Sequence, residues 1–369
     1  MDVLLEKLVK IKSISGEEEN ISNFIFDYLK DQGLTPIKQD GNVILHIKGN
    51  QNKALIFDAH IDTVEAGNVN KWEFPPSGQY SGKIKNGKLY GLGSSDNKSS
   101  VAVLMKLCKW VKENNPKWDV WFAFVVKEEV DGYGSKSFIK WLKSQYLEKY
   151  DDIQCVVCEP RGCKEVGLGN KGNIFVKIKI QGESGHSAKI NEIEKQAILE
   201  GVKVIKKLNE IENKLKKKYF DSDLGFTTIA ITGFEAVESS PNKIPGTCLI
   251  SLDIRTIPET HEKIIDIIKD ELMNFNLKFE WTYHSTQPVK TSKNSGIVKI
   301  LKKIDPELKI TYSSTNNDSC YFIKENIPTV VFGPGNKEQS HKENEFVNLK
   351  NLPICLGIFK KLVKGVEND

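Results

Sequence analysis

Four nearly continuous apolar segments in the first 160 residues constrain the fold of this chain more than any other feature. They are "NVILHIKG" (42–49), "KALIFDAHID" (53–62), "DVWFAFVVKE" (119–128) and "IQCVVCEP" (153–160). Amphipathic patterns typical of helices occupy the N-terminal residues and the segments 20–33, 98–115 and 135–149. Apolar strands that alternate with helices predict an α/β sheet that helices cover on both faces.

The pattern changes at about residue 172, where alternating strands replace apolar ones. Strands are predicted at 172–182, 226–234, 247–256 and 277–285, and helices at 191–217 and 259–275. This β-α-β-β-α-β order is that of the ferredoxin-like module. An α/β pattern then resumes with a helix at 296–304, a strand at 328–335 and a helix at 351–366. Because 369 residues exceed what one core usually organises, we expect a split domain, 1–171 and 287–369, around an inserted domain, 172–286.

The start of the helix at 20–33 carries a local signal of its own. The segment "SGEE" (15–18) fits a capping box, in which Ser15 is the N-cap and Glu18 reaches back to it.

Composition excludes several functional classes. The net charge of +4 is a small excess of 53 basic over 49 acidic residues, and the densest basic run, "NKLKKKYF", lacks interleaved aromatics. It therefore indicates a solvated helix face, and no nucleic-acid partner is expected. No apolar run approaches the ~18 residues of a membrane span, and the N-terminus reads as a helix, not a signal peptide.

The seven cysteines are odd in number and irregularly spaced, so we expect reduced thiols and a cytoplasmic location. Cys155 and Cys158 have the C-x-x-C spacing, but no second pair accompanies them. Buried thiols are the favoured interpretation of that pair.

Polar residues gather where the predicted strands end, which is where open α/β sheets place their sites. They are His60 and Asp62 in "AHIDTV", Asp96 in "GLGSSDNKSS", Glu128 and Glu129 in "VVKEE", Glu159 in "CEP", and His341 in "EQSHKENE". Singly, each has an ordinary structural explanation, such as an N-cap role for Asp96. Together, two histidines and several carboxylates match the ligands of zinc or a similar divalent ion. Asp62 has the position of a carboxylate that orients a ligating histidine.

The ordered set "HID", "GLGSSDNK", "KEE", "CEP", "GESGHSA" and "GPG…SHKENE" resembles the di-zinc amidohydrolases. That family includes acetylornithine deacetylase, succinyl-diaminopimelate desuccinylase, aminoacylase-1 and carboxypeptidase G. The resemblance covers essentially the whole chain. It implies a mixed-sheet, zinc exopeptidase-like α/β catalytic domain, with the inserted ferredoxin-like domain serving as a lid and as the contact of a homodimer.

The resemblance also implies a role for each residue of the set. His60 and Glu159 would bind one metal ion, Glu129 and His341 a second, and Asp96 would bridge the two. Zinc is the expected metal, and cobalt or manganese suits the same ligands. Glu128 would be the general base, Asp62 the residue that orients His60, and His186 the oxyanion donor, which in dimeric members comes from the neighbouring subunit.

The expected substrate is a small N-acyl amino acid or a short peptide. Only two of the 53 basic residues are arginines, Arg161 and Arg255, and arginine is the bidentate partner of carboxylates. We expect Arg255, Asn242 and the backbone N–H groups of Gly333 to Gly335 to bind the substrate carboxylate. Arg161 is equally compatible with a substrate contact and with a structural one.

Two segments depart from the pattern of the family. Ser99 and Ser100 stand where the family usually has two glycines, which puts the packing of the following helix start in question. The segment "STNNDSCYF" replaces the family's Gly-Thr-Ser-Asp type sequence, which weakens a specific assignment as a desuccinylase. Glu159, in place of an aspartate, resembles the deacylase and carboxypeptidase branches.

The leading hypothesis is therefore an amidohydrolase that releases an amino acid from an N-acyl derivative. A carboxypeptidase or dipeptidase of the same chemistry is the alternative. A catalytically silent binding protein is disfavoured, because the ligand set and Glu128 are all present.

Overall fold

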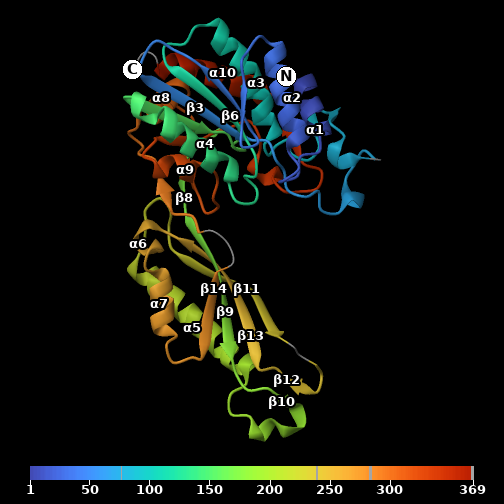
Figure 1. Cartoon of the computed structure of the whole chain (residues 1–369), viewed down its shortest axis with the longest axis vertical. Helices are drawn as coiled ribbons and strands as arrows, with labels where there is room; N and C mark the ends of the chain where they lie inside the picture. Colours follow the sequence, from blue (N-terminus) through green and yellow to red (C-terminus); the bar gives the residue numbers. More distant parts are fainter. Residues whose placement is uncertain (76, 238–239, 282–284, 367–369) are drawn as a thin grey trace. The chain divides into compact units, whose positions relative to one another are not determined.

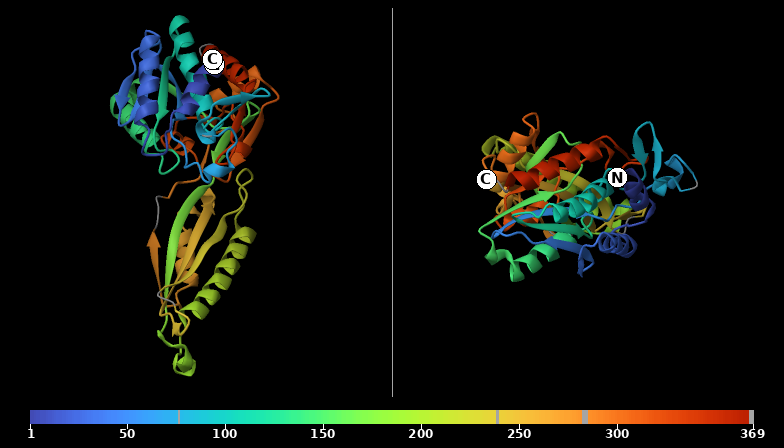
Figure 2. Two further views of the ribbon diagram at one scale, coloured as in Figure 1. Left: turned by 90° about the vertical axis from the view of Figure 1, so that its right-hand side faces the viewer. Right: turned by 90° about the horizontal axis from the view of Figure 1, so that it is seen from above.

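The computed structural model describes residues 1–75, 77–237, 240–281 and 285–366, and the chain divides into two compact units. Unit 1 comprises Met1–Gly169, Lys290–Thr311 and Asn317–Asp369, and unit 2 comprises Asn170–Val289 and Tyr312–Asn316. Figure 1 colours the chain from its N-terminus to its C-terminus, and Figure 2 gives two further views. The larger segment of unit 2 spans residues 170–289, and the inserted domain was expected at residues 172–286.

The nine-stranded mixed sheet has the order β1-β2-β6-β3-β7-β17-β8-β15, and β16 pairs with β8. Its central strands β6, β3, β7 and β17 run parallel, whereas β1, β2 and β8 pair antiparallel with their neighbours. The bounds are β1 (Ile37–Gln39), β2 (Asn42–Ile47), β3 (Lys53–His60), β6 (Asp119–Val125), β7 (Asp152–Val157), β8 (Glu165–Asn170), β15 (Val289–Lys290), β16 (Lys309–Ser313) and β17 (Thr329–Val331). A small sheet, β18-β5-β4, joins β4 (Lys83–Lys85), β5 (Lys88–Tyr90) and β18 (Phe346–Asn348).

Helices cover both faces of the main sheet, as the apolar strands predict. The helices of unit 1 are α1 (Asp2–Lys10), α2 (Glu19–Asp31), α3 (Lys98–Glu113), α4 (Tyr133–Gln145), α8 (Gly296–Ile304), α9 (Ser319–Lys324) and α10 (Asn351–Val366). On one face, Phe138 of α4 and Phe322 of α9 share a core with β2, β3, β6 and β7. On the other face, α3 packs against α10 (Figure 1). Phe359 of α10 contacts Phe57 of β3. No helix of the described segments is long and apolar enough to cross a membrane.

Unit 2 contains an antiparallel four-stranded sheet of order β11-β13-β9-β14. Its elements are β9 (Gly172–Gln181), β10 (Gly185–His186), α5 (Ala197–Lys218), β11 (Thr228–Val237), β12 (Lys243–Ile244), β13 (Thr247–Thr256), α6 (Pro258–His261), α7 (Ile264–Glu271) and β14 (Leu277–Trp281). Its own apolar core joins α5 and α7 to the buried face of the sheet, for example Leu208, Ile250 and Ile268. The long elements follow one another as strand, helix, strand, strand, helix and strand.

Some local predictions were wrong, and each has a physical reason. The capping box does not form, since α2 begins at Glu19 without a side-chain cap. Ser15 instead donates to Asp62, and Glu18 accepts the N–H of Lys127. The helix expected from residue 191 begins at Ala197, because residues 187–192 form a 3-10 turn capped by His186. The helix expected at 259–275 is interrupted between His261 and Ile264, which separates α6 from α7.

Candidate metal centre

Three of the expected ligands meet beyond the ends of β3 and β7. His60 is the last residue of β3, Asp96 lies in the loop before α3, and Glu159 follows β7 by two residues. The Nε2 atom of His60 lies 3.1 Å from Asp96 Oδ1 and 3.7 Å from Glu159 Oε1. One ligand atom from each residue lies within 4.8 Å of the others, a spacing compatible with a shared metal ion.

A second group shares Asp96 with the first. His341 Nε2 lies 3.0 Å from either carboxylate oxygen of Glu129 and 3.8 Å from Asp96 Oδ2. Ligand atoms of Asp96, Glu129 and His341 also lie within 4.8 Å of one another. Asp96 therefore presents Oδ1 to one group and Oδ2 to the other, which is the arrangement a bridging carboxylate requires. The side chain of His341 is 53% exposed, so this group is open to solvent.

The fold explains this convergence. The strands β6, β3 and β7 are adjacent and parallel, so their carboxyl ends lie at one edge of the sheet. His60 ends β3, the Glu128–Glu129 pair follows β6, and Glu159 follows β7. Asp96 and His341 come from loops, and His341 has a left-handed backbone with a φ of 61°.

Glu128 and Glu129 lie in a turn and not on a strand. The sequence places them at the end of a strand, but β6 ends at Val125, and Lys127 is left-handed with a φ of 57°. The alternation of side chains along a strand therefore does not separate the pair. The turn brings Glu129 to His341, and ligand atoms of both glutamates lie within 4.8 Å of one another and of a ring nitrogen of His60.

Asp62 forms hydrogen bonds both with this turn and with His60. Its carboxylate accepts the backbone N–H of Glu128 at 3.1 Å and that of Glu129 at 3.2 Å. Ser15 Oγ donates to the same carboxylate at 2.5 Å. His60 Nδ1 donates to the main-chain carbonyl of Asp62 at 3.1 Å and lies 3.4 Å from its carboxylate. This bond leaves Nε2 of His60 free to bind a metal.

Sequence reasoning missed Glu345, which anchors the loop that carries Asp96. The buried carboxylate of Glu345 accepts the backbone N–H groups of Gly93 (2.9 Å), Ser95 (2.6 Å) and Asp96 (2.9 Å). Burial and the charge of Asp96 raise the pKa of Glu345 to about 8. Glu345 is distant in sequence from this loop, so no local pattern predicts the contact.

Of the two serines that replace glycines at the start of α3, Ser99 has a hydrogen-bond acceptor, whereas the buried Oγ of Ser100 has no partner among the described residues. Ser99 and Ser100 are both fully buried, and Ser99 Oγ donates to the carbonyl of Ser95 at 3.3 Å. The peptide bond between Asp96 and Asn97 is cis.

A second buried acidic contact lies beside the site and was also missed. Ser135 Oγ of α4 lies 3.0 Å from Asp58 Oδ2 and 2.6 Å from Asp318 Oδ2, and all three side chains are buried. Asp58 precedes His60 by two residues on β3, and Asp318 precedes α9. Burial and the charge of Asp318 raise the pKa of Asp58 well above its usual range.

The electrostatics of the site suit cations. Burial and the charge of Asp96 raise the pKa of Glu159 to about 8. Burial and the neighbouring carboxylate of Glu159 also hold the pKa of Glu128 well above its usual range, against the opposing charge of His60. Carboxylates crowded in this way repel one another, and a divalent cation relieves the repulsion. Imidazole and carboxylate donors match zinc, cobalt or manganese. Among the described residues, no candidate metal group includes a cysteine, and Cys155 and Cys158 are buried free thiols.

The residues expected to bind substrate fall in both units. In unit 2, the β10–β12 pair brings His186 and Asn242 together, since the N–H of Ser187 donates to the Asn242 carbonyl at 3.0 Å. Arg255, on β13, makes a two-point ion pair with Asp253, with N–O distances of 2.8 and 2.9 Å.

Gly333 and Gly335 lie in unit 1 against the ligand-bearing loops. A Cβ at Gly333 would lie 2.5 Å from the Glu159 carbonyl oxygen, and one at Gly335 would lie 2.1 Å from that of Ser95. Their lack of side chains therefore lets the 333–335 turn pack against two of the ligand segments.

Comparisons with known proteins find relatives over most of the chain. Residues 56–365 match the model of peptidase family M20/M25/M40. A succinyl-diaminopimelate desuccinylase of Wigglesworthia glossinidia brevipalpis is 28% identical over 387 residues, which cover 98% of each chain. An acetylornithine deacetylase of Buchnera aphidicola is 26% identical over 398 residues, 98% of this chain and 97% of the relative. An M20 family metallo-carboxypeptidase from Sulfolobus solfataricus has a similar fold, with a TM-score of 0.76 and 20% identity over 99% of this chain and 98% of the other.

Proposed function

The chain belongs to peptidase family M20/M25/M40, and from that premise we propose that it hydrolyses the amide bond of an N-acyl amino acid. The observation that carries the proposal is the pair of ligand groups that share Asp96, with Glu128 beside them. A hydrolase acting on amide bonds is what the family and its relatives indicate. The deacylase assignment is supported by Glu159 and by the similarity to a succinyl-diaminopimelate desuccinylase and an acetylornithine deacetylase.

His60, Asp96 and Glu159 would hold one divalent ion, and Asp96, Glu129 and His341 the other, with zinc as the proposed metal. Bound there, such ions supply Lewis-acid activation of water and of the amide carbonyl. Glu128 takes the proton of the attacking water and passes it to the leaving amine. Asp62 fixes the turn that carries Glu128, and Glu345 fixes the loop that carries Asp96.

His186 is proposed as a donor to the oxyanion. Its Nδ1 accepts the N–H of Ala188 at 3.1 Å, so the proton of the neutral ring lies on Nε2. The imidazole is exposed and therefore available to a substrate. Arg255, Asn242 and the 333–335 turn are proposed to bind the substrate carboxylate. For Arg255, this requires the substrate to compete with or add to its pairing with Asp253.

A homodimer through unit 2 is part of the proposal. The strand β11 lies at an edge of its sheet, and Phe234 on it is 41% exposed. On α5, Leu199 is 53% exposed and Ile198 and Val202 are also exposed. An open strand edge beside exposed apolar side chains is typical of a protein–protein contact. Sedimentation velocity measures this directly, and a monomer at all concentrations would contradict it. A cytoplasmic location is likewise proposed, supported by seven free cysteines.

Matched substitutions of the two adjacent glutamates test the roles proposed for them, Glu128 as the general base and Glu129 as a metal ligand. Glu128→Gln is expected to lower kcat about 10²- to 10⁴-fold and to leave two metal ions per chain. Glu129→Gln is expected to lower the metal content itself, because it removes a ligand. Atomic emission spectroscopy of both purified variants gives the metal content. Metal loss in the Glu128 variant alone would mean that base and ligand are assigned the wrong way round.

A substrate panel separates the proposed deacylase from a carboxypeptidase or dipeptidase. The carboxypeptidase is the alternative that the structural similarity to the Sulfolobus enzyme suggests. The panel compares N-acetyl, N-succinyl and N-formyl amino acids with dipeptides. The highest kcat/KM is expected for an N-acyl amino acid. A preference for dipeptides would favour the peptidase, and no hydrolysis of any compound by the metal-loaded protein would contradict both.

A further inference from the structure

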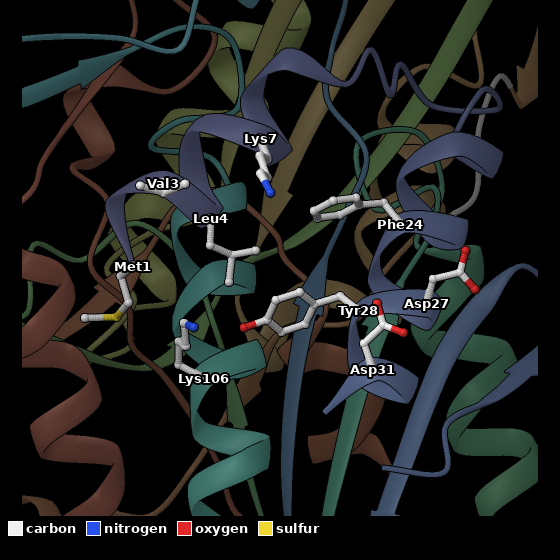
Figure 3. Close-up of a pocket in the computed structure, with 9 residues that line it drawn as sticks. All are labelled: Met1, Val3, Leu4, Lys7, Phe24, Asp27, Tyr28, Asp31 and Lys106. Carbon is white, nitrogen blue, oxygen red and sulfur yellow. The ribbon is translucent and has the colours of Figure 1, made fainter. Parts of the chain in front are cut away.

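Two surface cavities of unit 1 have similar volumes but different charge. One lies among the N-terminal helices and is lined by Asp27 and Asp31 opposite Lys7 and Lys106, with apolar side chains between them (Figure 3). The charges of its two acidic and two basic side chains balance. The other cavity, of about 390 Å³, lies near the segment that follows Glu159. Four cationic side chains line it, against two carboxylates, so it carries a net positive charge.

The four cations are Arg161, Lys164, Lys337 and Lys350. Within the described part of the chain, none of them has a carboxylate partner within ion-pair distance. The Nε atom of Arg161 is buried and lacks a hydrogen-bond acceptor. Burial of this N–H without an acceptor is unfavourable, so a conformation in which an occupant of the cavity supplies an acceptor would be favoured. Other lysines of the chain do form ion pairs, such as Lys143 with Glu325.

Neutral polar groups complete the lining. Asn336, Asn348 and Asn351 contribute amide side chains, and Asn351 is the first residue of the 16-residue helix α10. The positive end of that helix dipole adds to the attraction for an anion. The buried Asn351 amide donates to the carbonyl of Pro334 at 2.8 Å, which fixes this wall of the cavity.

The cavity is distinct from the ligand groups but attached to the segments that carry them. None of the five proposed metal ligands lines it. The N–H of Gly162 donates to the Gly335 carbonyl at 2.6 Å, and the N–H of Asn336 donates to Ser95 Oγ at 2.7 Å. Arg161 follows Glu159 by two residues, and Ser95 precedes Asp96.

We infer that this cavity is a binding site for a small molecule that carries a multivalent oxyanion, either a phosphate group or two carboxylates. Arg161 provides the planar donor, and the three lysines provide the surrounding charge. This assigns to Arg161 a role separate from the substrate carboxylate proposed for Arg255. The inference concerns binding and does not depend on which amide the protein hydrolyses.

Isothermal titration calorimetry on the metal-loaded, full-length protein tests the inference. Inorganic phosphate and succinate are titrated separately at constant ionic strength. Saturable binding is expected for at least one probe, and Arg161→Gln is expected to weaken it about tenfold or more. The double variant Lys337→Ala/Lys350→Ala weakens it as well and remains informative where the Arg161 variant folds poorly. Tighter binding of phosphate or of succinate identifies the anion class.

Lys361→Ala is the matched control, because Lys361 is exposed on α10, the helix that follows Lys350, but does not line the cavity. It is expected to bind both probes like the unaltered protein. Absence of binding by either probe overturns the inference. Equal affinities in the cavity variants and the control also overturn it, because the anion would then bind the metal ions or the general surface.

Discussion

Asp62 connects several parts of the site through its hydrogen bonds. It receives the backbone N–H groups of Glu128 and Glu129 as well as the hydroxyl of Ser15, and it lies beside His60. Burial alone would raise the pKa of Asp62, but the hydrogen bonds and charge of His60, with those from Ser15 and Glu129, outweigh burial and lower it. The side chain is therefore held as a carboxylate, which accepts the bonds from Ser15, Glu128 and Glu129.

Asp62→Asn is expected to weaken metal binding by about 10- to 100-fold, since the amide nitrogen faces donors that a carboxylate oxygen accepts. Competition with a chromophoric chelator measures the affinity. Ser15→Ala is the control, because it removes one of these bonds and keeps the carboxylate, and its effect should be much smaller. Equal affinities for Asp62→Asn and the unaltered protein would show that the turn holds the ligands without Asp62.

At the scale of secondary-structure elements, Asp119 ties the start of β6 to its surroundings. Its carboxylate accepts from Gly49 N (2.8 Å), Tyr150 Oη (2.6 Å) and His46 Nε2 (2.7 Å). Burial raises the pKa of Asp119, but the bonds from His46, Tyr150 and Gly49 outweigh burial and lower the pKa below its ordinary value of 3.8. A carboxylate of this kind stabilises the fold above its unfolded pKa, and that stability is lost as the pH falls through the folded pKa.

Asp119→Asn is accordingly expected to lower the free energy of unfolding by about 1–2 kcal/mol at pH 7. The difference from the unaltered protein should be the same at pH 5 and should shrink below about pH 4. Urea unfolding at pH 7, 5 and 3.5 measures it. Asp151→Asn, at an exposed neighbouring position, should change the free energy by less than about 0.5 kcal/mol at every pH. A pH-independent difference would mean that the charge of Asp119 contributes nothing.

Most elements were predictable because their signals are local. The apolar runs of β3, β6 and β7 and the amphipathic pattern of α10 lie within single segments of sequence. The capping box at Ser15 failed because two distant partners, Asp62 and Lys127, take the side chains of Ser15 and Glu18. The same limit applies to the site. The residues that meet as ligand groups follow predicted strands or match motifs, whereas Glu345 and the Asp58–Ser135–Asp318 contact depend on tertiary proximity alone.

At the scale of the whole molecule, each unit has its own apolar core, and the candidate metal groups among the described residues all lie in unit 1. Metal ions that bind only the folded form stabilise it, by about 4 kcal/mol at a thousandfold excess over Kd. For a unit of this size, that corresponds to a shift in Tm of about 10 °C. Metal binding should therefore stabilise unit 1 and leave the Tm of unit 2 unchanged.

Differential scanning calorimetry with and without a chelator tests this separation. Removal of metal is expected to lower the Tm of one transition by about 10 °C and to leave a second transition in place. Ile250→Ala, which creates a cavity in the core of unit 2, identifies that second transition because it should lower its Tm alone. If the protein instead shows a single transition that the chelator shifts, the two units unfold together, and the metal centre stabilises the molecule as a whole.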